Sequence, residues 1–335
     1  MLPAPPGAQC AIHPSIPAGG VCARCGNFMC TDCSVDGAQQ NCPTCRAKET
    51  TPDFPFDENA SFNELLNHVV EQFKRDAAMP VIATVIYFGI TMVGSVVSNM
   101  FTQIITTAMG SNLNDPNAIR DNPMAFVKAF AVSYVVSIVF QTLAQGVAIS
   151  ALYRLLIDIL HGRKGDLARM FNHLKELPKY LTLQLLVSAM TIVVPFALTG
   201  GAVAVCLKII GFDWEHPARA RPEDVFAPVP LAIFGGAMLI IVIFSIVMMP
   251  VMIFAMPEMV VSNCSPMEAM GRAFRLGSGQ RLRMFGYSLV SSIIIFVGVF
   301  ACCIGMLVTL PTGYMLLASL FLALRKNSGL PKYEL

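Results

Sequence analysis

The chain has 335 residues, of which 55% are hydrophobic and only 13% are charged, whereas soluble domains average about 45–50% and about 25%. We therefore expect most of the chain to lie in lipid. The formal net charge of +2 is too small to argue for nucleic-acid binding, and no nucleic-acid partner is predicted.

Residues 1–9 form a proline-rich tip, which we expect to be flexible. The tip has no basic segment and no apolar run, so it does not match a cleaved secretory signal. The N-terminal part is then expected to remain in the cytosol, where thiols stay reduced. This favours zinc-bound cysteines over disulfides.

Residues 10–48 contain four pairs of metal-type ligands, and two residues separate the members of each pair. A tight turn lets both members face one ion, and a structural zinc takes four such ligands in a tetrahedron. Eight ligands would complete two structural zinc sites with no vacant coordination position. The predicted metal ligands are Cys10, His13, Cys22, Cys25, Cys30, Cys33, Cys42 and Cys45.

The apolar residues between these ligands are too few for an independent core. Domains below roughly 40 residues usually need metals or disulfides to fold, so zinc removal is expected to unfold this one. The spacing leaves the pairing open. The pairs can join sequentially, first with second and third with fourth, or in an interleaved order, first with third and second with fourth.

The ligand order and spacing resemble the B-box class of cross-brace zinc fingers. B-boxes usually build the last pair from histidines, whereas this chain has Cys42 and Cys45 there. The resemblance implies the interleaved order, with one site formed by Cys10, His13, Cys30 and Cys33 and the other by Cys22, Cys25, Cys42 and Cys45.

Residues 49–60 form a predicted linker, which an amphipathic helix follows. Ser61 and Glu64 match a capping box, and apolar residues from Phe62 to Phe73 recur at steps of three and four. A core helix and an interfacial helix would both show this pattern. The position directly before a membrane span favours the interfacial alternative.

Residues 61–326 form the predicted membrane domain, and 327–335 a cytosolic tail. A span needs about 20 residues, so the last apolar run is long enough for two helices, which we expect to turn near Ile304 and Gly305. The predicted fold is mainly α, a polytopic bundle of six spans. The apolar runs cover 79–104, 129–152, 181–207, 229–256 and 284–324.

Lysines and arginines of this domain and its tail are distributed unevenly between the two sides. With the N-terminus inside, fifteen lie in inner segments and five in outer loops. This bias places both termini in the cytosol.

An amphipathic segment precedes each odd-numbered span, at 62–73, 167–177 and 267–276. The third begins with Ser265 as cap, Pro266 at the first helical position and Glu268 completing a capping box. The membrane domain is therefore predicted to consist of three units, each an amphipathic helix followed by a helical hairpin.

This layout resembles a group of uncharacterised bacterial six-span proteins that includes the membrane domain fused to some glycerophosphodiester phosphodiesterases. Residues 257–261 and 265–274 carry the resemblance, which covers about residues 60–326. It implies the helical fold and a location in the bacterial inner membrane. It implies no settled activity.

Ionisable residues inside the apolar runs are the usual sign of transport or catalysis, and Glu258 is the best candidate. We expect it at the inner surface, paired with Arg272 or Arg275, and Asp158 near Arg154. The histidines outside the zinc module are expected at the surface. Amides within the runs are expected to form hydrogen bonds between helices; they are Asn99, Gln103, Gln141, Gln145 and Gln184.

No catalytic constellation is present, so we predict no enzymatic activity and no catalytic residue. The leading hypothesis is an integral membrane protein, in contact with lipid, whose cytosolic zinc module binds another protein. The alternative is a transporter or channel for a small solute or lipid, regulated by that module. A third hypothesis is a lipid-handling enzyme or its accessory. A homo-oligomer is also compatible with the sequence.

Overall fold

The computed structural model describes residues 3–23, 25–34, 40–44, 54–108, 123–171, 174–210 and 228–330. The chain divides into two compact units. The first comprises Met1–Pro55 with Lys332–Leu335, and the second comprises Phe56–Pro331.

The first unit contains little regular structure in its described part. Strand β1 (Gly20–Val21) pairs antiparallel with β2 (Phe28–Met29), and the short helix α1 (Thr31–Ser34) follows. Gly26, in the turn between the strands, has a φ of +75°, a left-handed conformation that glycine adopts without a steric penalty. The turn and the paired strands hold Cys22 and Cys25 close to the segment that carries Cys30 and Cys33.

The second unit is helical. Six of its described helices are long and apolar enough to cross a membrane, which confirms the predicted mainly α, six-span fold. They are α4 (Ala78–Ala108), α6 (Pro123–Leu160), α8 (Leu177–Ile209), α10 (Pro228–Ser262), α12 (Arg281–Phe300) and α13 (Cys302–Lys326). The shorter elements are α3 (Phe62–Arg75), α7 (Leu167–Phe171), the 3-10 turn η1 (Leu174–Glu176) and α11 (Pro266–Gly277).

The predicted hairpin in the last apolar run is present, with its turn a few residues earlier than expected. Helix α12 ends at Phe300 and α13 begins at Cys302. A glycine makes the close crossing just before the turn possible, because a Cβ atom on Gly298 would lie 1.9 Å from Thr309 Oγ1. Only a residue without a side chain fits there.

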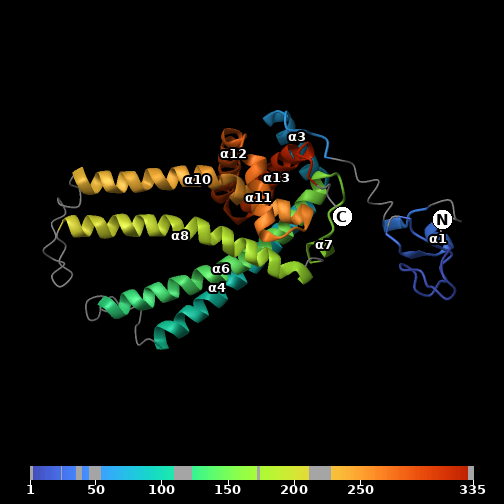
Figure 1. Ribbon diagram of the computed structural model, residues 1–335, viewed down its shortest axis with the longest axis horizontal. Helices are drawn as coiled ribbons and strands as arrows, with labels where there is room; N and C mark the ends of the chain where they lie inside the picture. Colours follow the sequence, from blue (N-terminus) through green and yellow to red (C-terminus); the bar gives the residue numbers. More distant parts are fainter. Residues whose placement is uncertain are drawn as a thin grey trace. The chain divides into compact units, whose positions relative to one another are not determined.

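The spans form three hairpins, in which α4 packs along α6, α8 along α10, and α12 along α13 (Figure 1). Helix α13 lies at the centre, since it contacts α3, α4, α6, α10 and α12. Its C-terminal half is buried, and Met315, Leu316, Leu320 and Phe321 have no exposed surface. The buried parts of α6 and α10 are likewise their C-terminal ends, so the core lies at the end of the bundle where α3, α11 and α13 gather.

The first amphipathic helix packs on the bundle. Its predicted capping box is confirmed, because Glu64 N donates to Ser61 Oγ and Ser61 N donates to the Glu64 carboxylate. Leu65 and Val69 of α3 are fully buried, and the helix contacts α13 and α6. Its apolar face is thus used in the protein core rather than left for lipid, because α6 continues past its apolar run to Leu160 and offers a surface there.

The other two amphipathic segments differ from each other. Helix α11 begins with Ser265 as cap and Pro266 in its first turn, as predicted. Only half of the predicted capping box is described, since Glu268 N donates to Ser265 Oγ while the Glu268 carboxylate pairs with Arg272. The helix packs on α10 with Ala269 and Ala273 fully buried. In the middle amphipathic segment, predicted at 167–177, the described residues before α8 form the five-residue helix α7 and the 3-10 turn η1.

Candidate metal centre

Backbone turns hold the cysteines of the first unit in position. Cys22 N donates to Asn27 O at 2.9 Å, and Gly26 N donates to Cys22 O at 3.0 Å. These bonds close the turn that carries Cys22 and Cys25. On the other side, Ser34 N donates to Cys30 O at 3.1 Å, so helix α1 holds Cys30 and Cys33 one turn apart.

Four side chains converge in the first ligand set, which consists of Cys10, His13, Cys30 and Cys33 with their ligand atoms all within 4.8 Å of one another. The Sγ atoms of Cys10 and Cys33 are 3.7 Å apart, and His13 Nδ1 lies 3.4 Å from the sulfurs of both Cys30 and Cys33. Tetrahedral zinc, with Zn–S bonds of about 2.3 Å, would place two sulfurs about 3.8 Å apart. The observed distances match that arrangement.

Three described cysteines form the second ligand set: Cys22, Cys25 and Cys42. Their closest sulfurs, those of Cys25 and Cys42, are 3.7 Å apart, and Cys42 N donates to Cys22 Sγ at 3.2 Å. The predicted fourth ligand, Cys45, lies outside the described residues. The grouping in both sets is the interleaved one.

Burial and neighbouring polar groups act differently on two thiols of the first set. Burial, helped by the adjacent sulfurs of Cys10 and Cys30, raises the pKa of Cys33 to about 12. Burial also opposes ionisation of Cys10, but backbone amides, first that of His13, outweigh it and lower its pKa to about 6. Without a cation the cluster does not favour several thiolates at once, whereas a bound divalent ion would hold them deprotonated.

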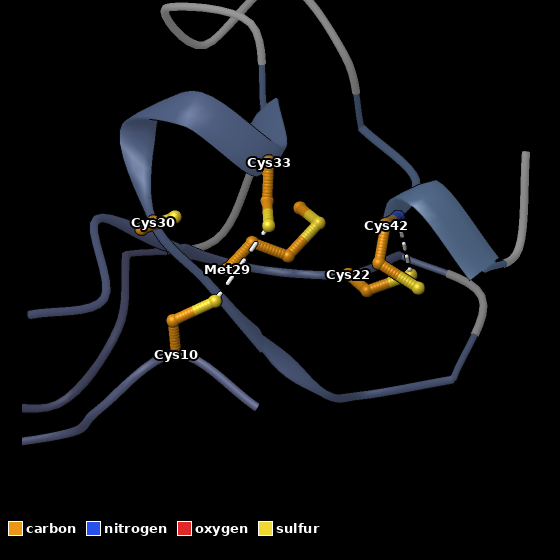
Figure 2. Packing of buried hydrophobic residues seen from close by; sticks show 6 residues of the cluster. All are labelled: Cys10, Cys22, Met29, Cys30, Cys33 and Cys42. Carbon is orange, nitrogen blue, oxygen red and sulfur yellow. Dashed lines mark hydrogen bonds between the residues drawn. The ribbon is translucent and has the colours of Figure 1, made fainter. Parts of the chain in front are cut away.

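The core of this unit consists largely of sulfur atoms. Met29 is 1% exposed and lies among the ligand cysteines (Figure 2), and Ile16 packs partly buried against the same cluster. Hydrocarbon burial on this scale is small for a folded unit. Both described ligand sets could therefore hold metal ions that stabilise the fold.

A second polar cluster lies in the membrane unit around Glu258, whose side chain has no exposed surface. Arg325 Nε donates to Glu258 Oε2 at 2.8 Å, and Arg272 Nη1 donates to Oε1 at 3.3 Å. Ser262 completes the cluster, donating to Glu258 and accepting from Arg325 Nη2 at 2.8 Å. The cluster joins α10, α11 and α13.

Arg272 is one of the two partners expected for Glu258, whereas Arg275 is exposed. Arg325 is a partner that sequence reasoning missed. It lies 67 residues from Glu258, and local spacing carries no signal for a contact between α10 and α13. Asp158 was expected near Arg154. In the structure it forms an ion pair with Arg163 at 3.4 Å, and Arg154 lies 3.6 Å from Glu176.

Two histidines expected at the surface are not free there. His161 is 7% exposed and donates through Nδ1 to Ile157 O at 2.8 Å. His68 is half-buried and donates through Nε2 to Leu160 O at 3.0 Å. Both fix the end of α6, while His173 and His216 lie outside the described residues.

The amides within the spans do not converge on an enclosed path. Asn99, Gln103, Gln141 and Gln145 are all exposed in the second unit. Gln184 of α8 is half-buried, and its Cβ would be 3.0 Å from a Cβ on Gly146 of α6. This close approach is a packing contact between the first and second hairpins.

Six candidate spans and two ligand sets define the class: a multi-pass membrane protein with Cys/His clusters that could hold metal ions. Over residues 162–327 a domain of unknown function (DUF7847) is found. That stretch covers α7 to α13, the second and third hairpins with their short helices. The two Cys/His ligand sets and the first hairpin precede it.

The comparison with protein families found neither a B-box match nor a phosphodiesterase-type match. The search of curated proteins returned no match, and neither did the search of solved structures. Both resemblances therefore stay predictions.

Proposed function

We propose that this protein is a non-enzymatic protein of a bacterial inner membrane, whose N-terminal zinc module binds a cytosolic protein. The observation that carries the proposal is the closed first ligand set. Its four ligands, Cys10, His13, Cys30 and Cys33, lie within 4.8 Å of one another and would fill a tetrahedral ion completely. Such a site stabilises a fold and leaves no coordination position for activating water.

Zinc is the metal that this donor set favours. Three thiolates with one imidazole, and a second set of cysteines, are typical of structural zinc sites. Cysteine-rich sites also persist as metal sites where thiols remain reduced. We assign both sites to zinc, with Cys45 as the fourth ligand of the second.

The cytosolic orientation of both termini is supported by where basic residues meet. Arg75 Nη2 donates to Arg163 O at 3.3 Å, and Lys179 Nζ donates to Asn263 Oδ1 at 3.3 Å. These contacts bring basic residues of separate inner segments to one end of the bundle. Such clustering on one side is typical of the cytosolic face.

The zinc module offers a small apolar surface to a partner. Ile12 is 43% exposed and Phe28 is 37% exposed, and the backbone joins them, since Ala11 N donates to Phe28 O at 3.0 Å. Aromatic and aliphatic side chains that are exposed on a metal-stabilised scaffold are common anchors of protein interfaces. The partner is a protein with a complementary apolar pocket.

Affinity purification of the full-length protein from detergent-solubilised membranes tests the proposal. We expect a partner to co-purify with the zinc-loaded protein and to be lost from the Ile12→Ser/Phe28→Ser variant, which keeps every ligand. The Cys30→Ser variant, which breaks the first site, should lose the same partner. Recovery of identical proteins with all three baits would refute a role for the zinc module in binding.

A further inference from the structure

The start of α12 carries two arginines that no carboxylate neutralises within the described ranges. In those ranges, the arginines of the second unit that form ion pairs with carboxylates are Arg154, Arg163, Arg272 and Arg325. Arg281 instead lies with its guanidinium 5.6 Å from the centre of the Phe274 ring. Its Nε atom is buried and has no hydrogen-bond partner. Donor capacity and positive charge are therefore unused at this point.

Among the described residues, Arg283 donates hydrogen bonds to neutral acceptors. Its guanidinium donates to the carbonyl oxygens of Glu58 and Ala60, in the segment 56–62 that precedes and begins α3. We call this segment the strap. Two bonds fold it into a turn, since Ala60 N donates to Asp57 O at 3.1 Å and Asn59 N donates to Asp57 Oδ1 at 2.9 Å.

Tyr287 completes the socket for the strap, one helical turn after Arg283. Its ring meets the edge of the Phe62 ring with centroids 5.1 Å apart, and the Arg283 guanidinium lies 5.7 Å from its centre. Arg283 and Tyr287 thus attach the strap to the third hairpin. These contacts are independent of the zinc sites.

The socket lies where a span begins. Helix α12 is apolar enough to cross the membrane from Arg281 onward, and Leu282 next to both arginines is 86% exposed. Exposed apolar side chains on a span are suited to face lipid, which would place both guanidinium groups at the level of phospholipid phosphates. A phosphate accepts two charge-assisted hydrogen bonds from a guanidinium fork, which are stronger than those to neutral carbonyl oxygens.

We propose that Arg283 binds the phosphate group of an anionic phospholipid, that Arg281 adds positive charge at the same end of α12, and that this headgroup competes with the strap for Arg283. The unpaired positive charge of the two side chains is the argument for an anionic ligand. The position in the first turn of a span is the argument for a lipid. When the headgroup is bound, the carbonyl oxygens of Glu58 and Ala60 lose their donor and the strap is released.

Hydrogen exchange of the full-length protein in nanodiscs tests this proposal. One preparation contains phosphatidylcholine alone, and the other contains equal parts of phosphatidylcholine and phosphatidylglycerol. Amides of residues 56–66 should exchange about tenfold faster with phosphatidylglycerol, because exchange reports local opening. The Arg283→Gln variant should exchange fast in both lipids, and Arg281→Gln should show a smaller lipid effect.

The control is Arg275→Gln, which removes one exposed arginine of α11 and should behave like the unchanged protein. Protection of α13 amides in every variant shows that the bundle is folded. Equal strap exchange in the two lipids, or a fully protected strap in Arg283→Gln, would overturn the proposal. Acceleration by free phosphate in pure phosphatidylcholine, to the level seen with phosphatidylglycerol, would overturn the assignment to a lipid.

Discussion

At Glu258 a carboxylate with no exposed surface accepts hydrogen bonds from Arg325, Arg272 and Ser262. The buried Arg325 and the half-buried Arg272 share this single acid, and Arg272 also contacts Glu268. In such a cluster each charge stabilises the others, and the removal of one leaves buried charge without compensation. Glu258 is therefore expected to matter for stability rather than for chemistry.

The Glu258→Gln substitution should destabilise the membrane unit by about 3–5 kcal/mol, because Arg325 and Arg272 lose their shared counter-charge. Denaturation of the detergent-purified protein, followed by circular dichroism, measures the change. Glu268→Gln is the matched control, since the Glu268 side chain is 48% exposed and such a pair contributes about 0–1 kcal/mol. Equal effects of the two substitutions would contradict the buried network.

At the scale of elements, α3 joins separate parts of the bundle through its two ends. Its first turn is capped by Ser61 and Glu64. Beyond its last turn, Asp76 Oδ2 accepts from Gly165 N at 2.8 Å. The helix therefore links the strap, α13 and the segment after α6. Its stability is expected to depend on the capping box.

The pH dependence of the α3 cap has a definite sign. Hydrogen bonds from Ser61, first from its backbone amide, lower the pKa of Glu64. A folded-state pKa below the unfolded value means that the stabilisation is complete above the unfolded value, near pH 4.3, and is lost as pH falls through the folded one. Glu64→Gln should therefore speed hydrogen exchange of α3 at pH 7.

At a pH below both values, the same substitution should make no difference to α3 exchange. Ser61→Ala should weaken the helix at either pH, because its hydroxyl oxygen caps Glu64 N whether or not Glu64 is charged. A Glu64→Gln effect that stays constant across this pH range would show that charge plays no part in the cap.

The sequence predicted elements better than their packing. The apolar runs gave the spans because length and hydropathy are local properties, and Ser61 with Glu64 gave the start of α3. Whether Leu65 and Val69 faced lipid or protein depended on how far α6 and α13 extend, which no local pattern contains. For the same reason the sequence did not predict the contact of Arg325 with Glu258, which lies on another helix.

The ligands were easier to predict than the membrane contacts. Residue type and spacing were enough to predict the first ligand set, Cys10, His13, Cys30 and Cys33. The structure brings their ligand atoms together. The pairing required the path of the chain, which the turn at Gly26 and the antiparallel strands determine. Spacing alone was equally compatible with the sequential order.

On the scale of the whole molecule, the two units are expected to respond separately to metal removal. Zinc analysis of the full-length protein should give two ions per chain, and Cys30→Ser should lower the count to one. A strong chelator should unfold the first unit, because its core is mainly sulfur, while helicity of the second unit persists. Circular dichroism measures that helicity.

Cys264→Ser is the control for this experiment, since Cys264 is buried in the second unit outside both ligand sets. It should retain two ions. A zinc content of one ion or none in the unchanged protein would overturn the site assignments, and a loss of helicity across the spans on chelation would contradict the independence of the two units.

The central position of α13 has a consequence for biosynthesis. Ribosomes make α13 after the five other described spans, yet it contacts both preceding hairpins and supplies Arg325 to Glu258. Until residue 325 has left the ribosome, the first two hairpins lack their contacts with α13. During this time the Glu258 carboxylate also lacks its partner Arg325. Translation products that stop short of α13 should therefore be recognised as unassembled and degraded by membrane quality control.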